Sequence, residues 1–166
     1  MKNLRMTKVL SVTLFVLTLF VVGMTNAQAQ TFTVGNLNYS LNNDGVSVTV
    51  TGHVDGENAT GELVIPESVD LYGTTYPVTA IGDDAFSACS GFTGSLTIPN
   101  SVVTIGYGAF WGCSGFAGSL TIGTSVTTIR GYAFQNCSGF TGSLTIPNSV
   151  TTIFYYAFGG CSGFTG

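Results

Sequence analysis

Residues 89–112 read CSGFTGSLTIPNSVVTIGYGAFWG, and residues 137–160 read CSGFTGSLTIPNSVTTIFYYAFGG. The two segments are identical at 20 of 24 aligned positions. The segment between them keeps the same frame, with Gly123 and Thr124 in the place of Pro-Asn, and the four cysteines of the sequence recur every 24 residues. A tandem period of this length predicts a solenoid, in which one supersecondary unit stacks on the next.

Each repeat contains one short stretch in which polar and apolar residues alternate. In the first complete repeat this stretch covers residues 95–98, and the alternation predicts a strand with Leu96 and Ile98 on one side. Pro99 ends the strand, because proline cannot continue a ladder of backbone hydrogen bonds. A period of 20–29 residues with a short strand in each unit predicts a β-rich leucine-rich-repeat solenoid.

The rest of the repeat is expected to form a second short extended piece at residues 102–105 and a turn or one-turn helix at residues 109–110. Apolar residues that recur in frame should point into the coil, where stacking stabilises each large side chain by about 1.5–3 kcal/mol. These expected core residues are Phe92, Leu96, Ile98, Val102, Ile105, Ala109, Phe110, Cys113, Phe134 and Cys137.

An N-terminal β cap is expected over residues 30–61, ahead of the repeats. Apolar residues alternate at 37–41 and again at 46–50, and Asp44 and Gly45 between them suit the tight turn of a β-hairpin. Such a cap covers the strand edge and the core face that a first coil would otherwise expose.

The solenoid itself is expected over residues 62–166. Residues 62–66 look like a first, degenerate strand, and residues 70–78 should form a small hairpin that turns at Gly73. The hexamer at 161–166 opens another repeat, so we expect the solenoid to be truncated in its last repeat.

The in-frame pattern of Leu-x-Ile-Pro, Ser-Val-x-x-Ile, Ala-Phe and Cys resembles the BspA-like, Treponema-type leucine-rich repeats of bacterial surface proteins. Residues 72–86, YGTTYPVTAIGDDAF, are similar to the first repeat of such proteins. The resemblance implies an exported protein, extracellular or on the bacterial cell surface, that serves adhesion and protein–protein contact. It carries over no catalytic position. The repeat here is one residue longer between Phe92 and Leu96 than the usual form of that family.

The first 29 residues have the three-part pattern of a secretory signal peptide. Basic residues at 2, 5 and 8 precede an apolar run at 9–22, and Ala27 and Ala29 lie where a signal peptidase reads small side chains. The run of 14 residues is short of the roughly 20 that span a bilayer, which disfavours a membrane anchor. We therefore expect cleavage after Ala29 and no stable membrane span in the mature chain.

The charges argue against nucleic acid as a partner. The sequence has 4 lysines and arginines against 8 acidic residues, and removal of the leader leaves Arg130 as the one basic residue, for a net charge of 1 − 8 = −7. All eight acidic residues precede residue 85. A chain so poor in cations has no electrostatic footprint for a phosphate backbone.

Catalysis has few candidate groups in this sequence. His53 is the only histidine, and the alternation of Val46, Val48 and Val50 places it on the solvent face of the cap. General acid–base and nucleophilic chemistry need titratable groups that converge on one site, and the repeats offer only Arg130. We expect neither enzyme activity nor a cofactor.

The cysteines should form one column, with one thiol in each coil. Neighbouring Cα atoms would lie within disulfide range, but parallel Cβ vectors would hold the β-carbons further apart than the roughly 3.5–4.5 Å that a bridge prefers. We expect reduced, buried thiols that act as small apolar groups, and no metal site, because no histidine accompanies them.

Positions that vary while their frame stays fixed should face outward. We call the aromatic residues among them, together with one arginine, the aromatic surface; they are Tyr107, Trp111, Arg130, Tyr132, Phe154, Tyr155 and Tyr156. Exposed tyrosine and tryptophan give large contact areas at small entropic cost. The alternative is that these rings stack on one another across coils and shield the backbone.

A second outward-facing set consists of the hydroxyl residues of the repeated strand. We call it the hydroxyl row; it comprises Ser95, Thr97, Ser119, Thr121, Ser143 and Thr145. Its expected role is that of a solvated sheet face.

The sequence therefore favours a module that binds a protein of a host or bacterial surface. A passive structural spacer of a larger surface protein and a carbohydrate-binding surface remain alternatives.

Overall fold

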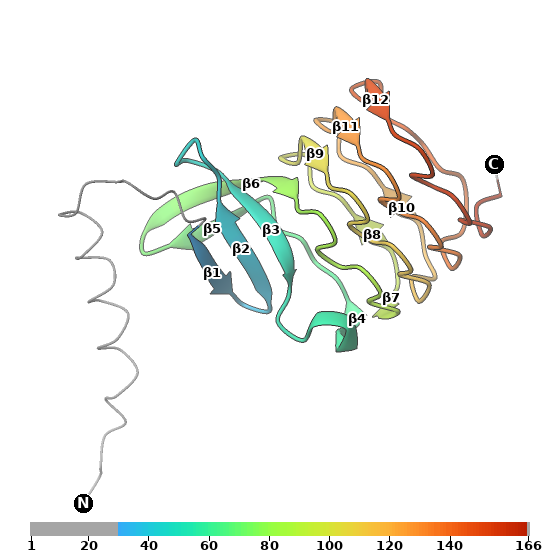
Figure 1. Cartoon of the computed structure of the whole chain (residues 1–166), viewed down its shortest axis with the longest axis horizontal. Helices are drawn as coiled ribbons and strands as arrows, with labels where there is room; N and C mark the ends of the chain where they lie inside the picture. The colour runs from blue at the N-terminus through green and yellow to red at the C-terminus, as the bar shows by residue number, and fades with distance from the viewer. Residues whose placement is uncertain (1–29, 166) are drawn as a thin grey trace, which may run out of the picture.

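The computed structural model describes residues 30–165, a stack of β-coils behind an N-terminal sheet (Figure 1). The predicted signal peptide lies outside these residues. Apart from the short 3-10 turn η1 (Gly56–Asn58), the described part of the chain consists of strands and turns. None of its helices is long and apolar enough to cross a membrane. The β-rich solenoid that the repeats predict is confirmed.

The N-terminal cap is a meander of three antiparallel strands, β1 (Thr31–Val34), β2 (Leu37–Leu41) and β3 (Val48–His53). The hairpin of β2 and β3 is as expected, whereas β1 is an addition that the sequence analysis missed. The Asp44 side chain holds the turn, because it accepts hydrogen bonds from the backbone N–H groups of Val46 and Ser47 at 2.9 and 3.0 Å. Val46 belongs to this exposed turn, so the inward alternation begins only at Val48.

The expectation that His53 faces solvent is wrong. Its partner in β2 is Leu37, whereas Tyr39 pairs with Val50, so the β3 side carries one extra residue between the two pairs. A β-bulge of this kind inverts the in–out alternation beyond it, and His53 is only 9 % exposed. The bulge places Gly52 so close to the next coil that a Cβ there would lie 2.9 Å from the carbonyl oxygen of Ala85.

The cap joins the solenoid through strand pairing. β5 (Ser68–Leu71) and β6 (Thr74–Ile81) form the hairpin expected around Gly73. The end of β6 pairs in parallel with β3 on one side and with β9 (Thr104–Ile105) on the other. The same row continues through β11 (Thr128–Ile129) to β12 (Thr152–Ile153), so that one sheet runs from the cap to the last described coil (Figure 1).

Two smaller pairs of strands complete the coils. β4 (Thr60–Glu62) pairs with β7 (Gly91–Thr93), and β8 (Leu96–Thr97) pairs with β10 (Leu120–Thr121), both in parallel. The first degenerate strand predicted at residues 62–66 is not formed, because β4 ends at Glu62 and residues 63–66 belong to no strand. The side chains there nevertheless alternate, since Leu63 and Ile65 are buried and Val64 is exposed.

The core is a set of columns in which each residue packs on its own equivalent in the next coil. One column stacks Phe86, Phe110, Phe134 and Phe158, with ring centroids 5.3, 5.2 and 5.3 Å apart. A second column stacks Phe92, Phe116, Phe140 and Phe164 at 5.7, 5.0 and 5.9 Å. Every core residue that the sequence predicts is at most 1 % exposed.

Candidate binding surface

The aromatic surface is carried by the turns that follow β9, β11 and β12. Each turn begins after the isoleucine that ends its strand. The side chains that follow occupy repeat positions that vary between coils. Their exposed fractions are 39 % for Tyr107, 46 % for Trp111, 47 % for Phe154, 58 % for Tyr155 and 66 % for Tyr156, while Tyr132 is half-buried. The exposure is greatest in the last described coil.

Four tyrosines of this surface form a ladder across three coils. Tyr132 meets Tyr107 edge-to-face at 5.3 Å and Tyr155 edge-to-face at 5.1 Å, and it stacks on Tyr156 at 5.7 Å. Trp111 and Phe154 contact no other aromatic ring within the described residues. The tyrosines therefore stack on one another across coils, as the alternative expects, while Tyr107, Tyr155 and Tyr156 still expose much of their area, so that a contact surface stays a prediction.

Two of these tyrosines occupy a backbone conformation that favours glycine. Tyr132 and Tyr156 have φ angles of 59° and 53°, and the equivalent position of the earlier coils holds Asp84 at 52° and Gly108 at 57°. The left-handed region costs a residue with a Cβ about 1–2 kcal/mol. Large aromatic side chains thus occupy positions where the backbone conformation of the turn favours glycine.

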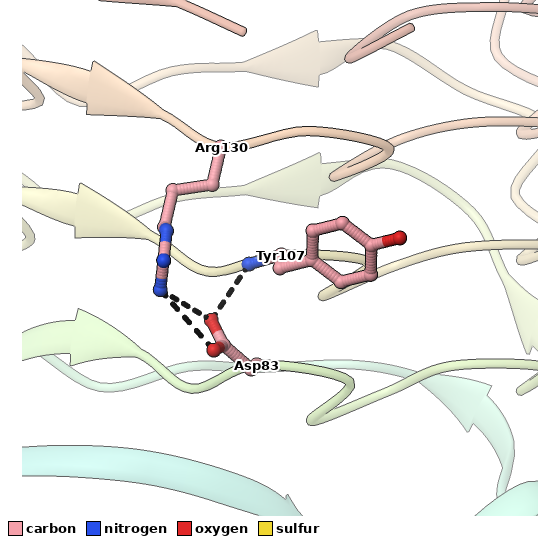
Figure 2. Close-up of polar contacts among 3 residues, drawn as sticks. All are labelled: Asp83, Tyr107 and Arg130. Atoms are coloured by element: carbon pink, nitrogen blue, oxygen red, sulfur yellow. Dashed lines mark hydrogen bonds and ion pairs between the residues drawn. The ribbon is translucent and has the colours of Figure 1, made fainter. Parts of the chain in front are cut away.

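Arg130 is the one basic residue of the aromatic surface, and it is not a free cation. Its guanidinium contacts both carboxylate oxygens of Asp83 at 3.0 and 3.1 Å, and the same carboxylate accepts the backbone N–H of Tyr107 at 2.8 Å (Figure 2). Each of the three residues comes from a different coil (Figure 2). Arg130 therefore links coils, and the other six residues of the aromatic surface are uncharged.

The buried His53 is held by contacts within the cap and with the first coil. Its Nδ1 accepts the backbone N–H of Asp55 at 3.1 Å, and its ring packs edge-to-face on Phe92 at 5.8 Å. Within residues 30–165, no three His, Cys, Asp or Glu side chains come close enough together to hold a metal ion.

The four cysteines form the expected column, and each is a free thiol. The Sγ atoms of Cys113, Cys137 and Cys161 donate to the carbonyl oxygens of Phe86, Phe110 and Phe134 at 2.9, 3.0 and 3.0 Å. Burial raises the pKa of Cys113 to about 12, and it also raises the pKa of Cys137 well above its usual range. These thiols are protonated and shielded packing groups.

The hydroxyl row is exposed at all six of its residues. The sequence analysis missed one feature of this row. A groove of about 610 Å³ separates the coil of Ser119 and Thr121 from the coil of Ser143 and Thr145. The one signal in the sequence is the departure from Pro-Asn at Gly123 and Thr124.

Comparisons with known proteins agree with this architecture. The model of the BspA type leucine-rich-repeat region matches residues 67–165 in six copies. A leucine-rich repeat protein from Bacteroides capillosus is 28 % identical over 82 % of this chain and 99 % of its own, with a TM-score of 0.61. No curated protein matches the chain.

Two further solved structures share the fold. A leucine-rich cell surface protein from Faecalibacterium prausnitzii is 31 % identical over 82 % of this chain, with a TM-score of 0.67, and this chain spans only 36 % of its length. The T. pallidum leucine-rich repeat protein is 23 % identical over 82 % of this chain and 70 % of its own, with a TM-score of 0.63.

Proposed function

We propose, from the premise that this chain belongs to the family of BspA-type leucine-rich-repeat proteins, that it is a protein-binding module of an exported bacterial protein. The partner would be a protein of a host or bacterial surface, which makes adhesion the proposed role. Membership of the family supports a protein-interaction module in general. The name of the F. prausnitzii relative, a cell surface protein, supports the location.

The observation that carries the proposal is the placement of Tyr156. This residue is 66 % exposed and has a φ angle of 53°. A side chain that is strained and also solvated gains little from the fold, so its presence is better explained by a contact outside it. Trp111 and Phe154 add exposed aromatic area without ring partners in the described part of the chain, and such residues dominate the binding energy of protein interfaces.

The aromatic surface carries no charge of its own apart from Arg130, which is paired with Asp83, and this fits a protein partner with an apolar or aromatic contact patch. Arg130 is held by Asp83, so the surface offers no free cation for a phosphate or a carboxylate. Desolvating uncharged rings costs little compared with desolvating ions. We therefore infer that recognition depends on aromatic packing and responds weakly to salt.

The proposal is tested by capture of surface proteins on immobilised chain, followed by measurement of affinity for the captured partner. The test variant combines Trp111→Ala, Phe154→Ala and Tyr156→Gly, and the matched control removes the hydroxyls of the exposed Ser90, Ser114 and Ser138 by substitution with alanine. All variants must first show the melting temperature of an intact fold.

Loss of affinity of about 100-fold or more in the aromatic variant, with no loss in the hydroxyl control, is the expected result, because hot-spot residues contribute about 2 kcal/mol or more each. A partner that binds the aromatic variant as well as the native chain would refute this contact surface. Capture of nothing by the native chain would favour a structural spacer.

A further inference from the structure

The strand row that carries the hydroxyl row is paired at its centre and open at both ends. Four equivalent segments face one another here, at residues 62–66, 95–99, 119–123 and 143–147. In the central pair the N–H groups of Leu96 and Ile98 donate to the carbonyl oxygens of Ser119 and Thr121 at 3.0 and 2.9 Å. Within the described residues, no such bond joins 63–66 to 95–99 or 119–123 to 143–147. A groove lies at each of these two places, of about 360 and 610 Å³ respectively.

One repeat position explains which pair closes. A Cβ on Gly123 would lie 2.3 Å from the carbonyl oxygen of Pro99 in the coil below, which is nearer than atoms can approach, so the central pair closes because residue 123 has no side chain. In the two open pairs, the residue equivalent to Gly123 is Pro99 in segment 95–99 and Pro147 in segment 143–147. A proline ring at this position holds its coil away from the coil below, and we infer that Pro147 opens the larger groove.

The larger groove exposes backbone groups of residues 119–123 on one wall and of residues 143–147 on the other. On one wall the N–H groups of Leu120 and Ile122, which the register of β8 and β10 turns away from β8, have no hydrogen-bond partner among the described residues. On the other wall the carbonyl oxygens of Ser143 and Thr145, which would be their partners by analogy with the central pair, are also unpaired within those residues. Unpaired backbone groups of a nearly buried strand are costly, and a ligand with matching donors and acceptors would satisfy them.

The lining of this groove also limits the chemistry of its ligand. Its side chains are hydroxyls, aliphatic groups, one proline and one amide, with no charged and no aromatic residue. An anionic or cationic ligand would have no counter-charge. A sugar ring would find no aromatic face on which to stack, whereas an extended peptide presents a row of backbone donors and acceptors that matches the walls.

We propose that the groove beneath Pro147 is a second binding site, which takes an uncharged, extended peptide segment of a protein partner through its backbone. The site is separate from the aromatic surface, because it lies in the strand row of β8 and β10 and not in the turns after β9, β11 and β12. The smaller groove differs in carrying Glu62 and Glu67, so the two grooves would not share a ligand.

The test measures amide hydrogen exchange at Leu120 and Ile122 by NMR in the full chain. The probe is a short blocked peptide of alternating threonine and valine. The same peptide with alternate backbone nitrogens methylated lacks half the donors, and maltohexaose represents an uncharged glycan. Pro147→Gly should close this groove, and Pro99→Gly is the matched control that acts on the smaller groove alone.

In the native chain we expect fast exchange at Leu120 and Ile122 beside slow exchange at Leu96 and Ile98. The probe peptide at about ten times its Kd should slow the former about tenfold, and the methylated peptide should not. Pro147→Gly should slow both amides without peptide and abolish binding, while Pro99→Gly should bind as the native chain does. No protection by the peptide, equal protection by its methylated form, protection by maltohexaose instead, or unchanged fast exchange in a folded Pro147→Gly variant would each overturn the proposal.

Discussion

Single positions of the repeat differ sharply in what they contribute to stability. Phe134 and Trp111 illustrate the contrast, because both are large aromatic residues near the end of a turn. Phe134 is fully buried and stacks between Phe110 and Phe158, whereas Trp111 is 46 % exposed and has no ring partner within the described residues. Position in the 24-residue repeat, rather than residue type, determines how much each aromatic side chain contributes to the free energy of unfolding.

Phe134→Ala should lower the free energy of unfolding by about 3–5 kcal/mol, because it leaves a cavity between two coils. Trp111→Ala should change it by less than about 0.5 kcal/mol, as expected for an exposed residue outside any packed cluster. Chemical denaturation of both variants checks this pair of predictions. A loss of stability in the Trp111 variant comparable to that of the Phe134 variant would assign the indole to the core.

The thiol of Cys113 should make the fold less stable at high pH. Burial raises its pKa from 9.0 to about 12 in the folded chain, so above pH 9 the unfolded chain loses this proton before the folded chain does. The stabilising contribution is therefore complete below pH 9 and falls as the pH rises toward 12, with a slope of at most about 1.4 kcal/mol per pH unit for one thiol.

Denaturation of the native chain and of Cys113→Ala at pH 8, 10 and 11 measures this contribution. The difference between the two proteins should shrink as the pH rises, since the variant has no thiol to ionise at this position. A difference that stays constant over this range would show that the thiol ionises equally in both states.

At the scale of elements, polar contacts join coils that are not neighbours in sequence. The carboxylate of Asp83 connects the coil of Tyr107 with that of Arg130, and 47 residues separate the two charged side chains (Figure 2). Both charged side chains are about half exposed, at 50 % and 55 %. Water and salt therefore screen the pair, and it orients the turns more than it stabilises them.

A double-mutant cycle with Arg130→Gln and Asp83→Asn should give a coupling free energy of about 0.2–1 kcal/mol. The asparagine keeps an oxygen that can accept the N–H of Tyr107, so the cycle isolates the ion pair. The coupling should decrease in about 1 M salt, where the Debye length is about 3 Å. A coupling that is insensitive to salt would contradict a solvent-screened pair.

The whole molecule is a one-dimensional stack, so stability is shared between neighbouring coils and differs along the chain. Cap strand β3 covers the first coil by pairing with β6. At the other end Ile153 is 47 % exposed, whereas its equivalents Ile105 and Ile129 are fully buried. In such stacks each coil is stabilised chiefly by its direct neighbours.

Amide hydrogen exchange should therefore be slowest in the central coils and faster in residues 143–165. The last described coil buries less of its apolar surface, and local opening there exposes less of the core. Exchange followed by mass spectrometry on peptic fragments would show the gradient. Equal protection in the central and last coils would mean that the stack opens only as one cooperative unit.

What the sequence by itself determined is the frame of the coil. A strict period places each residue on its own equivalent in the next coil, so the buried columns of Phe110 and Cys113 and the outward positions of Trp111 and Tyr155 follow from local alternation and repetition. These features can be read from one repeat and its alignment with the next repeat. The candidate aromatic surface could be named for the same reason.

The tertiary structure alone decided features that depend on the distance between coils or on pairing across them. The bulge opposite β2 turned His53 inward, and the strand β1 joined the cap. Asp83 met Arg130 across an intervening coil. Gly123 lies against the Pro99 carbonyl where the central strand pair closes, and a groove lies on either side of that pair. No local pattern encodes such contacts, because each arises from the approach of backbone segments that the period places near one another without fixing their separation.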